Sequence, residues 1–198
     1  MANLRKSPYI WVKWLAKVMA GDITCQWQSW FQSQNQLTKK QSSDFDLVGW
    51  SIDHTKMLTE LKEELIKEKY NPIIEQFINY KMPNSDITIA GKPDCIIEKE
   101  DEIIIYDCKT GKERASDQVQ VMVYMYLLSK GEFHGKQSKG VVIYKDKKIE
   151  IPNLPENFED NFNFFVNILS SPKPPTKNHG ADCKFCSITK NDCSERVD

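Results

Sequence analysis

Residues 91–111 read GKPDCIIEKEDEIIIYDCKTG, with two apolar runs on either side of a polar turn. This pattern predicts a β-hairpin. If the turn is centred on residues 100–101, Asp94 lies directly across from Asp107 on the paired strand. Opposed residues share one face of a sheet, and Lys109, two residues further on, points to that same face. The sequence therefore predicts that two carboxylates and a lysine converge.

These three residue types suit hydrolysis of a phosphate ester. Carboxylate oxygens are the ligands that Mg²⁺ or Mn²⁺ prefers, and such an ion polarises a phosphate and lowers the pKa of a bound water. A lysine beside the ion can orient the water and offset developing charge. The alternative is a surface hairpin with ordinary cross-strand charges, since Asp-x-Lys is common by chance. Pro93-Asp94 at hairpin distance favours the catalytic interpretation.

The rest of the chain predicts helices and strands in a mixed α/β order. Apolar residues at helical spacing indicate most of the helices, and Asp53 is a plausible N-cap for one of them. Residues 32–43 and the proline-rich residues 171–176 are expected to be loops. The expected helices are 10–20, 25–31, 54–70, 115–130 and 156–169, and the expected strands are 73–78, 86–98, 102–109, 140–145 and 148–151.

Three motifs together resemble those of RecB-like nucleases in the PD-(D/E)xK superfamily. They are Gly91-Lys92-Pro93-Asp94, Asp107-Cys108-Lys109-Thr110-Gly111, and Gln120 with Tyr124, which lie four apart and so share a helical face. For that last pair alone, a buried helix with two satisfied polar groups would be the better interpretation. The resemblance implies a restriction-endonuclease-like core, a mixed central sheet flanked by helices. The catalytic residues that it implies are Asp94, Asp107, Lys109, Gln120 and Tyr124.

The resemblance also implies a metal ligand on a helix before the sheet. His54 is the candidate, and Glu75, expected on a strand, is a weaker one. Either would join Asp94, Asp107 and the backbone carbonyl of Cys108 around Mg²⁺ or Mn²⁺. The sequence departs from the family in one respect, because the usual Gly-x-x-x-His-like context does not surround His54.

The cysteines suggest a second metal site. Cys183 and Cys186, two residues apart, can reach one ion, and Cys193 follows closely in the same polar tail. Three thiolates leave a tetrahedral set one ligand short, and Cys25 is the best fourth. The two remaining cysteines neighbour the hairpin carboxylates and therefore face the opposite side of the sheet, where they pack as small hydrophobes. They are Cys95 and Cys108.

This arrangement resembles iron–sulfur RecB-like nucleases, among them the CRISPR-associated adaptation nucleases and AddB-type helicase–nucleases. The resemblance implies a [4Fe–4S] cluster that joins the two ends of the chain as a clasp. Spacing alone does not exclude zinc. Unligated cysteines are a third interpretation, disfavoured by the tight triplet.

Composition fits one domain of 198 residues, with 40% hydrophobic residues and a net charge of -1. We expect an N-terminal helical segment (1–45), a nuclease core (50–170) and a cysteine tail (180–198). The apolar run 9–20 contains two lysines and is too short to span a membrane, so a cytoplasmic protein without a membrane partner is expected. Without a global basic field, any DNA contact must come from a local groove.

The expected function is a Mg²⁺- or Mn²⁺-dependent deoxyribonuclease, an exonuclease or a single-strand-acting enzyme. Its expected substrate is DNA that is single-stranded or has a free end. DNA repair or recombination, CRISPR adaptation and mobile-element replication are all open as its role, as are protein partners and an oligomer. The alternative is a non-catalytic DNA-binding or assembly subunit with a zinc or iron–sulfur clasp. An isolated zinc-binding interaction module would leave the hairpin motif unused.

Overall fold

The predicted hairpin lies inside a mixed five-stranded sheet. The computed structural model describes residues 2–37 and 46–196 of the chain. The central strand of the sheet pairs antiparallel with its partner in the hairpin and parallel with the strand on its other side. The order across the sheet is β10 (Lys148–Ile151), β9 (Gln137–Tyr144), β8 (Glu102–Lys109), β7 (Cys95–Glu98) and β4 (Ile73–Ile74).

Three shorter strands form a second sheet, and two others form a ribbon. The second sheet has the order β2 (Tyr9–Trp11), β6 (Thr88–Gly91) and β5 (Ile78–Lys81). The ribbon pairs β1 (Ala2–Leu4) with β3 (Asn35–Leu37).

The expected strand 86–98 is therefore two strands, one in each of the larger sheets. The chain leaves the three-stranded sheet after Gly91 and enters the five-stranded sheet at Cys95. Pro93 lies between them, and a proline cannot donate to a strand ladder. The expected strand 73–78 divides in the same way, between β4 and β5.

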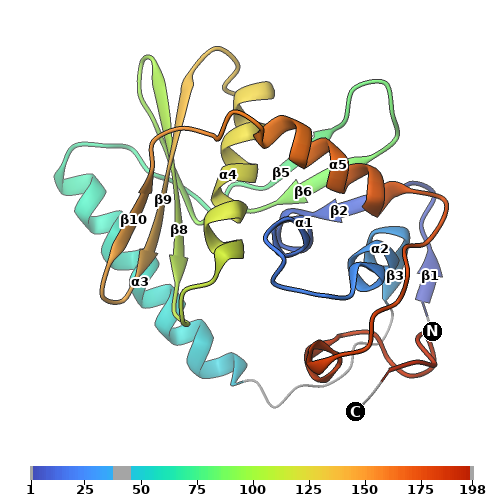
Figure 1. Ribbon diagram of the computed structural model, residues 1–198. Coiled ribbons are helices and arrows are strands. Elements are labelled where there is room, and N and C mark those ends of the chain that lie inside the picture. The colour runs from blue at the N-terminus through green and yellow to red at the C-terminus, as the bar shows by residue number, and fades with distance from the viewer. Residues whose placement is uncertain (1, 38–45, 197–198) are drawn as a thin grey trace.

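Helices cover both faces of the five-stranded sheet (Figure 1). Ile103, Ile105 and Val142 belong to the core shared with α1, α4 and α5, whereas Cys108 and Ile143 pack with Leu61 and Leu65 of α3. α4 connects β8 to the parallel strand β9 and is buried on most sides, as its composition predicts. The helices are α1 (Val12–Met19), α2 (Gln26–Gln34), α3 (Leu47–Lys67), α4 (Ala115–Lys130) and α5 (Phe158–Ser170), followed by a 3₁₀ turn, η1 (Ala181–Phe185).

Several expected boundaries were wrong. α3 begins at Leu47, where the Asp46 side chain accepts a hydrogen bond from the Gly49 backbone N–H (2.9 Å), so Asp53 is not its cap. The first helix starts two residues late, since Ile10 and Trp11 belong to a strand. Of the expected loop 32–43, the first residues continue α2 and form β3, and residues 38–43 lie outside the described part.

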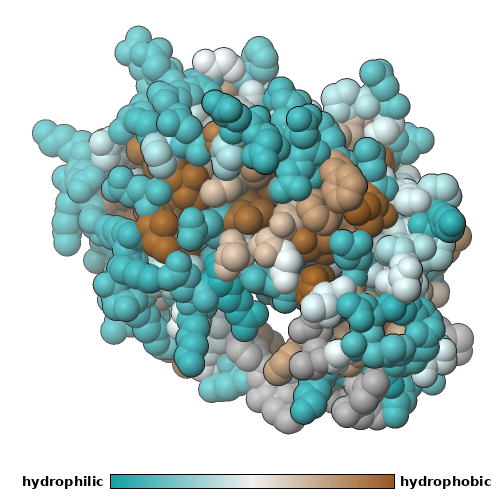
Figure 2. All heavy atoms as spheres, viewed as in Figure 1, coloured by the Kyte–Doolittle hydropathy of each residue, from teal (hydrophilic) through white to brown (hydrophobic). Residues whose placement is uncertain are grey.

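Figure 2 shows the same face as Figure 1, with apolar residues gathered in its middle and polar residues around them. The face is hollowed below α1, on the side where the cysteine tail lies. Among the helices that the structure describes, none has the length and apolarity needed to cross a bilayer.

Candidate functional site

The two hairpin aspartates lie opposite one another, where β7 begins and β8 ends. The register pairs Cys95 with Tyr106, so the next position places Asp94 opposite Asp107, as the sequence predicts. Both side chains are nearly buried, with 8% of Asp94 and 2% of Asp107 exposed. Asp94 Oδ2 accepts a hydrogen bond from the Cys108 backbone N–H (2.7 Å), which ties the end of one strand to the other.

His54 reaches this pair from α3. Its Nε2 lies 3.1 Å from Asp94 Oδ2. The hydrogen bond with Asp94 raises the pKa of His54, against the opposing effect of burial. The Trp50 ring stacks on the imidazole, with centroids 5.1 Å apart. The structure therefore brings the His54 side chain to the hairpin carboxylates.

Glu75 lies elsewhere than expected. It sits between β4 and β5, with a left-handed φ of 52°, and is not a strand residue. Its backbone N–H donates to the Asp94 carbonyl (3.0 Å), but its carboxylate pairs with Lys92 at 2.7 Å. Glu75 therefore supports the backbone of Asp94 while its side chain is engaged with Lys92.

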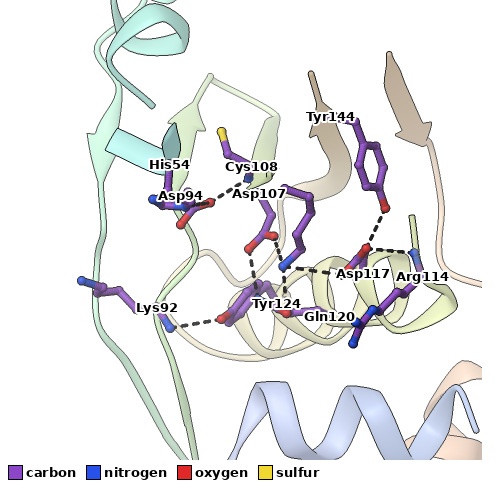
Figure 3. Close-up of polar contacts among 11 residues, drawn as sticks. His54, Lys92, Asp94, Asp107, Cys108, Arg114, Asp117, Gln120, Tyr124 and Tyr144 are labelled. Carbon is purple, nitrogen blue, oxygen red and sulfur yellow. Dashed lines mark hydrogen bonds and ion pairs between the residues drawn. The ribbon is translucent and has the colours of Figure 1, made fainter. Parts of the chain in front are cut away.

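Lys109 is the last residue of β8, and its side chain extends toward α4 (Figure 3). Its Nζ is 2.6 Å from Asp107 Oδ2 and donates to Gln120 Oε1 at 3.2 Å. Gln120 Nε2 in turn donates to Asp107 Oδ1 at 3.1 Å. Burial alone would lower the pKa of Lys109, but the charges of Asp107, Asp117 and Asp94 outweigh it and raise that pKa. Lys109 is therefore held as a cation beside the carboxylates.

Tyr124 closes the site on the α4 side. Its hydroxyl accepts a hydrogen bond from the Lys92 backbone N–H at 3.2 Å (Figure 3), and burial raises its pKa. A Cβ atom at Gly91 would lie 2.6 Å from the Tyr124 ring and 2.9 Å from Val12. The glycine of the Gly-Lys-Pro-Asp motif is thus required for the close approach of α4.

Asp117 is a buried member of the site that the sequence analysis missed. Its carboxylate accepts from the Tyr144 hydroxyl (2.8 Å) and from the Arg114 backbone N–H (3.0 Å). Lys109 Nζ lies 3.8 Å from the same carboxylate. The signal was available, because Asp117 precedes Gln120 by three residues and so lies on the same helical face.

The chemistry of the two aspartates suits a hard cation. Both oxygens of the Asp107 carboxylate have a partner, Oδ2 the Lys109 ammonium at 2.6 Å and Oδ1 the Gln120 amide at 3.1 Å. Two nearly buried carboxylates, Asp94 and Asp107, nevertheless lie opposite one another, and a cation between them would offset the cost of burying two negative charges. Within residues 2–37 and 46–196, however, no three His, Cys, Asp or Glu side chains are close enough together to hold an ion.

Asp107 should make the metal-free protein less stable as pH rises. Burial, with the nearby Asp94 and Asp117, raises its pKa from 3.8 to about 6, and Lys109 opposes this. The folded state then binds more protons than the unfolded state between about pH 4 and pH 6, so the free energy of unfolding falls across that window. Asp107→Asn should remove this fall and raise the melting temperature at pH 7 by on the order of 5 °C.

Thermal melts in EDTA between pH 4 and pH 7 measure this effect. Asp101→Asn is the matched control, since it removes an exposed carboxyl at the turn of the same hairpin. Equal pH dependence in wild type and Asp107→Asn would show that Asp107 titrates normally.

The four predicted cluster ligands line a single pocket, formed by α2 and the C-terminal tail. They are free thiols, not disulfides. The two other cysteines are buried on the α3 side of the sheet, where burial raises the pKa of each to about 12. The pocket thiols are Cys25, Cys183, Cys186 and Cys193, and the buried thiols are Cys95 and Cys108.

Other contacts hold the tail against the N-terminal segment. Gln32 Nε2 donates to Ser187 Oγ at 2.7 Å, and the Ala2 backbone N–H donates to Asp192 Oδ1 at 3.1 Å. Lys177 lies over the Trp27 ring, 4.8 Å from its centroid. The two ends of the chain therefore meet at the thiol pocket.

Comparisons with known proteins match this chain to one family model and to solved structures of similar fold. The family model described as "PD-(D/E)XK nuclease superfamily" matches residues 13–189. A solved structure titled "Crystal structure of SSO0001" superposes with a TM-score of 0.51 at 16% identity, over 99% of this chain and 90% of that one. A search of curated protein sequences found no match.

Proposed function

The chain belongs to the PD-(D/E)XK nuclease superfamily, and from that premise we propose that it is a Mg²⁺- or Mn²⁺-dependent deoxyribonuclease acting on single-stranded DNA or DNA ends. The observation that carries the proposal is the convergence of Asp94, Asp107 and Lys109 with His54, from two strands and a helix. A non-catalytic subunit would have no need of this set of charged groups in a nearly buried position.

The proposed metal ligands are His54, Asp94, Asp107 and the Cys108 backbone carbonyl. When bound, the ion would polarise the scissile phosphate and lower the pKa of a water ligand. Glu75, whose carboxylate is paired with Lys92, stays the weaker alternative ligand.

The proposed role of Lys109 is to hold the attacking water and to offset negative charge on the phosphate. Gln120 bridges Lys109 and Asp107, and so fixes the lysine beside the carboxylate. Tyr124 anchors the Lys92 backbone, two residues before Asp94, and so positions the turn that carries this ligand.

We further propose a [4Fe–4S] cluster in the pocket of Cys25, Cys183, Cys186 and Cys193, with zinc as the alternative. Four free thiols from both ends of the chain lining one pocket support this assignment. The cluster would be structural, because its ligands belong to the tail and α2 region and not to the carboxylate site. An ultraviolet–visible spectrum of anaerobically purified protein, with iron and zinc analysis, separates the two metals.

The function is tested by incubating purified protein with single-stranded DNA, linear and circular, in Mg²⁺, Mn²⁺ or EDTA. We expect degradation with either metal and none in EDTA. Degradation of linear but not circular DNA would assign an exonuclease. A well-folded, metal-loaded protein that cleaves neither substrate would favour the non-catalytic subunit.

His54→Ala should raise the metal concentration that gives half-maximal activity by about tenfold, since it removes one ligand and leaves two carboxylates. Gln120→Ala should instead lower the maximal rate with little change in that concentration, because Gln120 contacts Lys109 and Asp107 but supplies no ligand. Metal titrations of cleavage by both variants measure the difference. An unchanged metal dependence of His54→Ala would assign its ligand position to Glu75 or to water.

A further inference from the structure

Three basic side chains gather at the rim of the carboxylate site on the α1 side. Lys13 and Lys17 lie four apart on α1 and therefore on one helical face. Arg114 lies at the N-terminus of α4, and its side chain extends toward α1 in Figure 3. Lys13 and Arg114 are exposed, and Lys17 is half-buried.

Two contacts place α1 along the functional face of α4. At one end, Val12 and Tyr124 both approach Gly91. At the other end, the Asp22 carboxylate, just after α1, accepts from the Ser116 backbone N–H at 3.0 Å. The two lysines therefore lie beside the stretch of α4 that carries Gln120.

The charges of these side chains act on one another. Shielding from water by surrounding atoms lowers the pKa of Lys13, and the positive charges of Lys109 and Arg114 lower it further. Shielding, Lys13 and Arg114 lower the pKa of Lys17 in the same way. Asp107, Asp117 and Asp22 act in the opposite direction but do not cancel the effect.

Four other lysines in this half of the molecule have acidic partners. Lys145 pairs with Asp53 at 2.6 Å, and Lys92 pairs with Glu75 at 2.7 Å. Lys147 and Lys148 pair with Glu113 and Glu64. Across the described ranges, no carboxylate lies within ion-pair distance of Lys13, Lys17 or Arg114. This rim therefore keeps a positive potential that an anion can neutralise.

We propose that Lys13, Lys17 and Arg114 bind backbone phosphates of the DNA strand next to the scissile phosphate. The inference rests on the proposed nuclease function and adds the path of the strand, which runs over the α1–α4 seam. Lysine and arginine ammonium and guanidinium groups are the usual partners of phosphodiesters. This local cluster also supplies the basic surface that the net charge of -1 does not.

The test is the salt dependence of DNA binding, measured by fluorescence anisotropy with a labelled single-stranded oligothymidylate. An Asp107→Asn background keeps the DNA intact during the measurement. Removing two phosphate contacts should lower the slope of log affinity against log salt by about 1.4. Lys13→Ala/Lys17→Ala should therefore bind at least about tenfold more weakly at moderate salt, whereas Lys13→Arg/Lys17→Arg should bind normally.

Lys62→Ala/Lys67→Ala is the matched control, since it removes two exposed lysines from α3 with the same change in net charge. It should leave the slope unchanged. An unaltered slope in the Lys13/Lys17 variant, or an equal loss in the control, overturns the proposal. These outcomes are separate from failure of the nuclease function, which is read from cleavage by the wild-type chain in Mg²⁺ or Mn²⁺.

Discussion

Replacing Asp107 with alanine is expected to slow metal-dependent DNA cleavage by about a thousandfold or more, which corresponds to roughly 4 kcal/mol of transition-state stabilisation. Asp107 is proposed as a metal ligand, and its carboxylate is nearly buried opposite Asp94. Its loss would also release Lys109 and Gln120, which both contact the carboxylate. The variant should nevertheless fold, because it removes a buried charge whose pKa is raised by burial.

Two further variants distinguish the loss of a metal ligand from the loss of the lysine. Asp94→Asn keeps an oxygen that can accept from the Cys108 backbone N–H but removes the charge, so it should lose both activity and metal affinity. Lys109→Met keeps the aliphatic stem without the ammonium, so it should lose activity while retaining metal binding. Single-turnover cleavage rates and calorimetric metal titrations on the same preparations measure the two effects.

Asp101→Asn serves again as the control, since its side chain is exposed at the far end of the hairpin. It should cleave at the wild-type rate. Wild-type turnover by Asp107→Ala, Asp94→Asn or Lys109→Met would remove that residue from the proposed site. Circular dichroism and melting curves show whether an inactive variant is folded.

The hairpin could be predicted because its signals are local. Two apolar runs around a polar turn specify which residues pair, and the alternation of side chains then places Asp94, Asp107 and Lys109 on one face. The structure has this register. The helix after it is buried on most sides and apolar in composition, so its type and limits also follow from sequence.

The remaining features depend on tertiary contacts that a pattern does not contain. The three-residue strand β2 forms because it pairs with β6. In the sequence its residues cannot be told from the first turn of α1, which follows without a break. The N-terminus of α3 was missed because apolar residues there, such as Leu47 and Val48, are exposed and do not follow the buried face of the helix. In the sequence, Lys13 and Lys17 are visible only as interruptions of an apolar run, because the role proposed for them depends on which helix lies beside α1.

Replacing Cys25 with serine is expected to remove most of the bound metal and to lower the melting temperature by about 10–20 °C. Cys25 is proposed as the one cluster ligand outside the tail. A cluster shared with Cys183 would close a loop of ~160 residues, and cross-linking so long a loop stabilises a fold by on the order of 5 kcal/mol. Activity should fall with stability, and recover at temperatures where the variant is folded.

Contacts that do not involve thiols should keep the Cys25→Ser variant folded, so that its metal content can be measured. Gln32 to Ser187 and Ala2 to Asp192 already join the chain ends, so Cys25→Ser should remain folded at low temperature. Cys95→Ala is the matched control, because Cys95 is buried on the far side of the sheet and should keep its full metal content. Metal analysis and melting curves of both variants decide between the sites. Full metal content in Cys25→Ser, together with loss of metal in Cys95→Ala, would mean that Cys95 and not Cys25 is the fourth ligand. Unchanged metal and stability in both would mean that neither Cys25 nor Cys95 is a ligand of the structural metal.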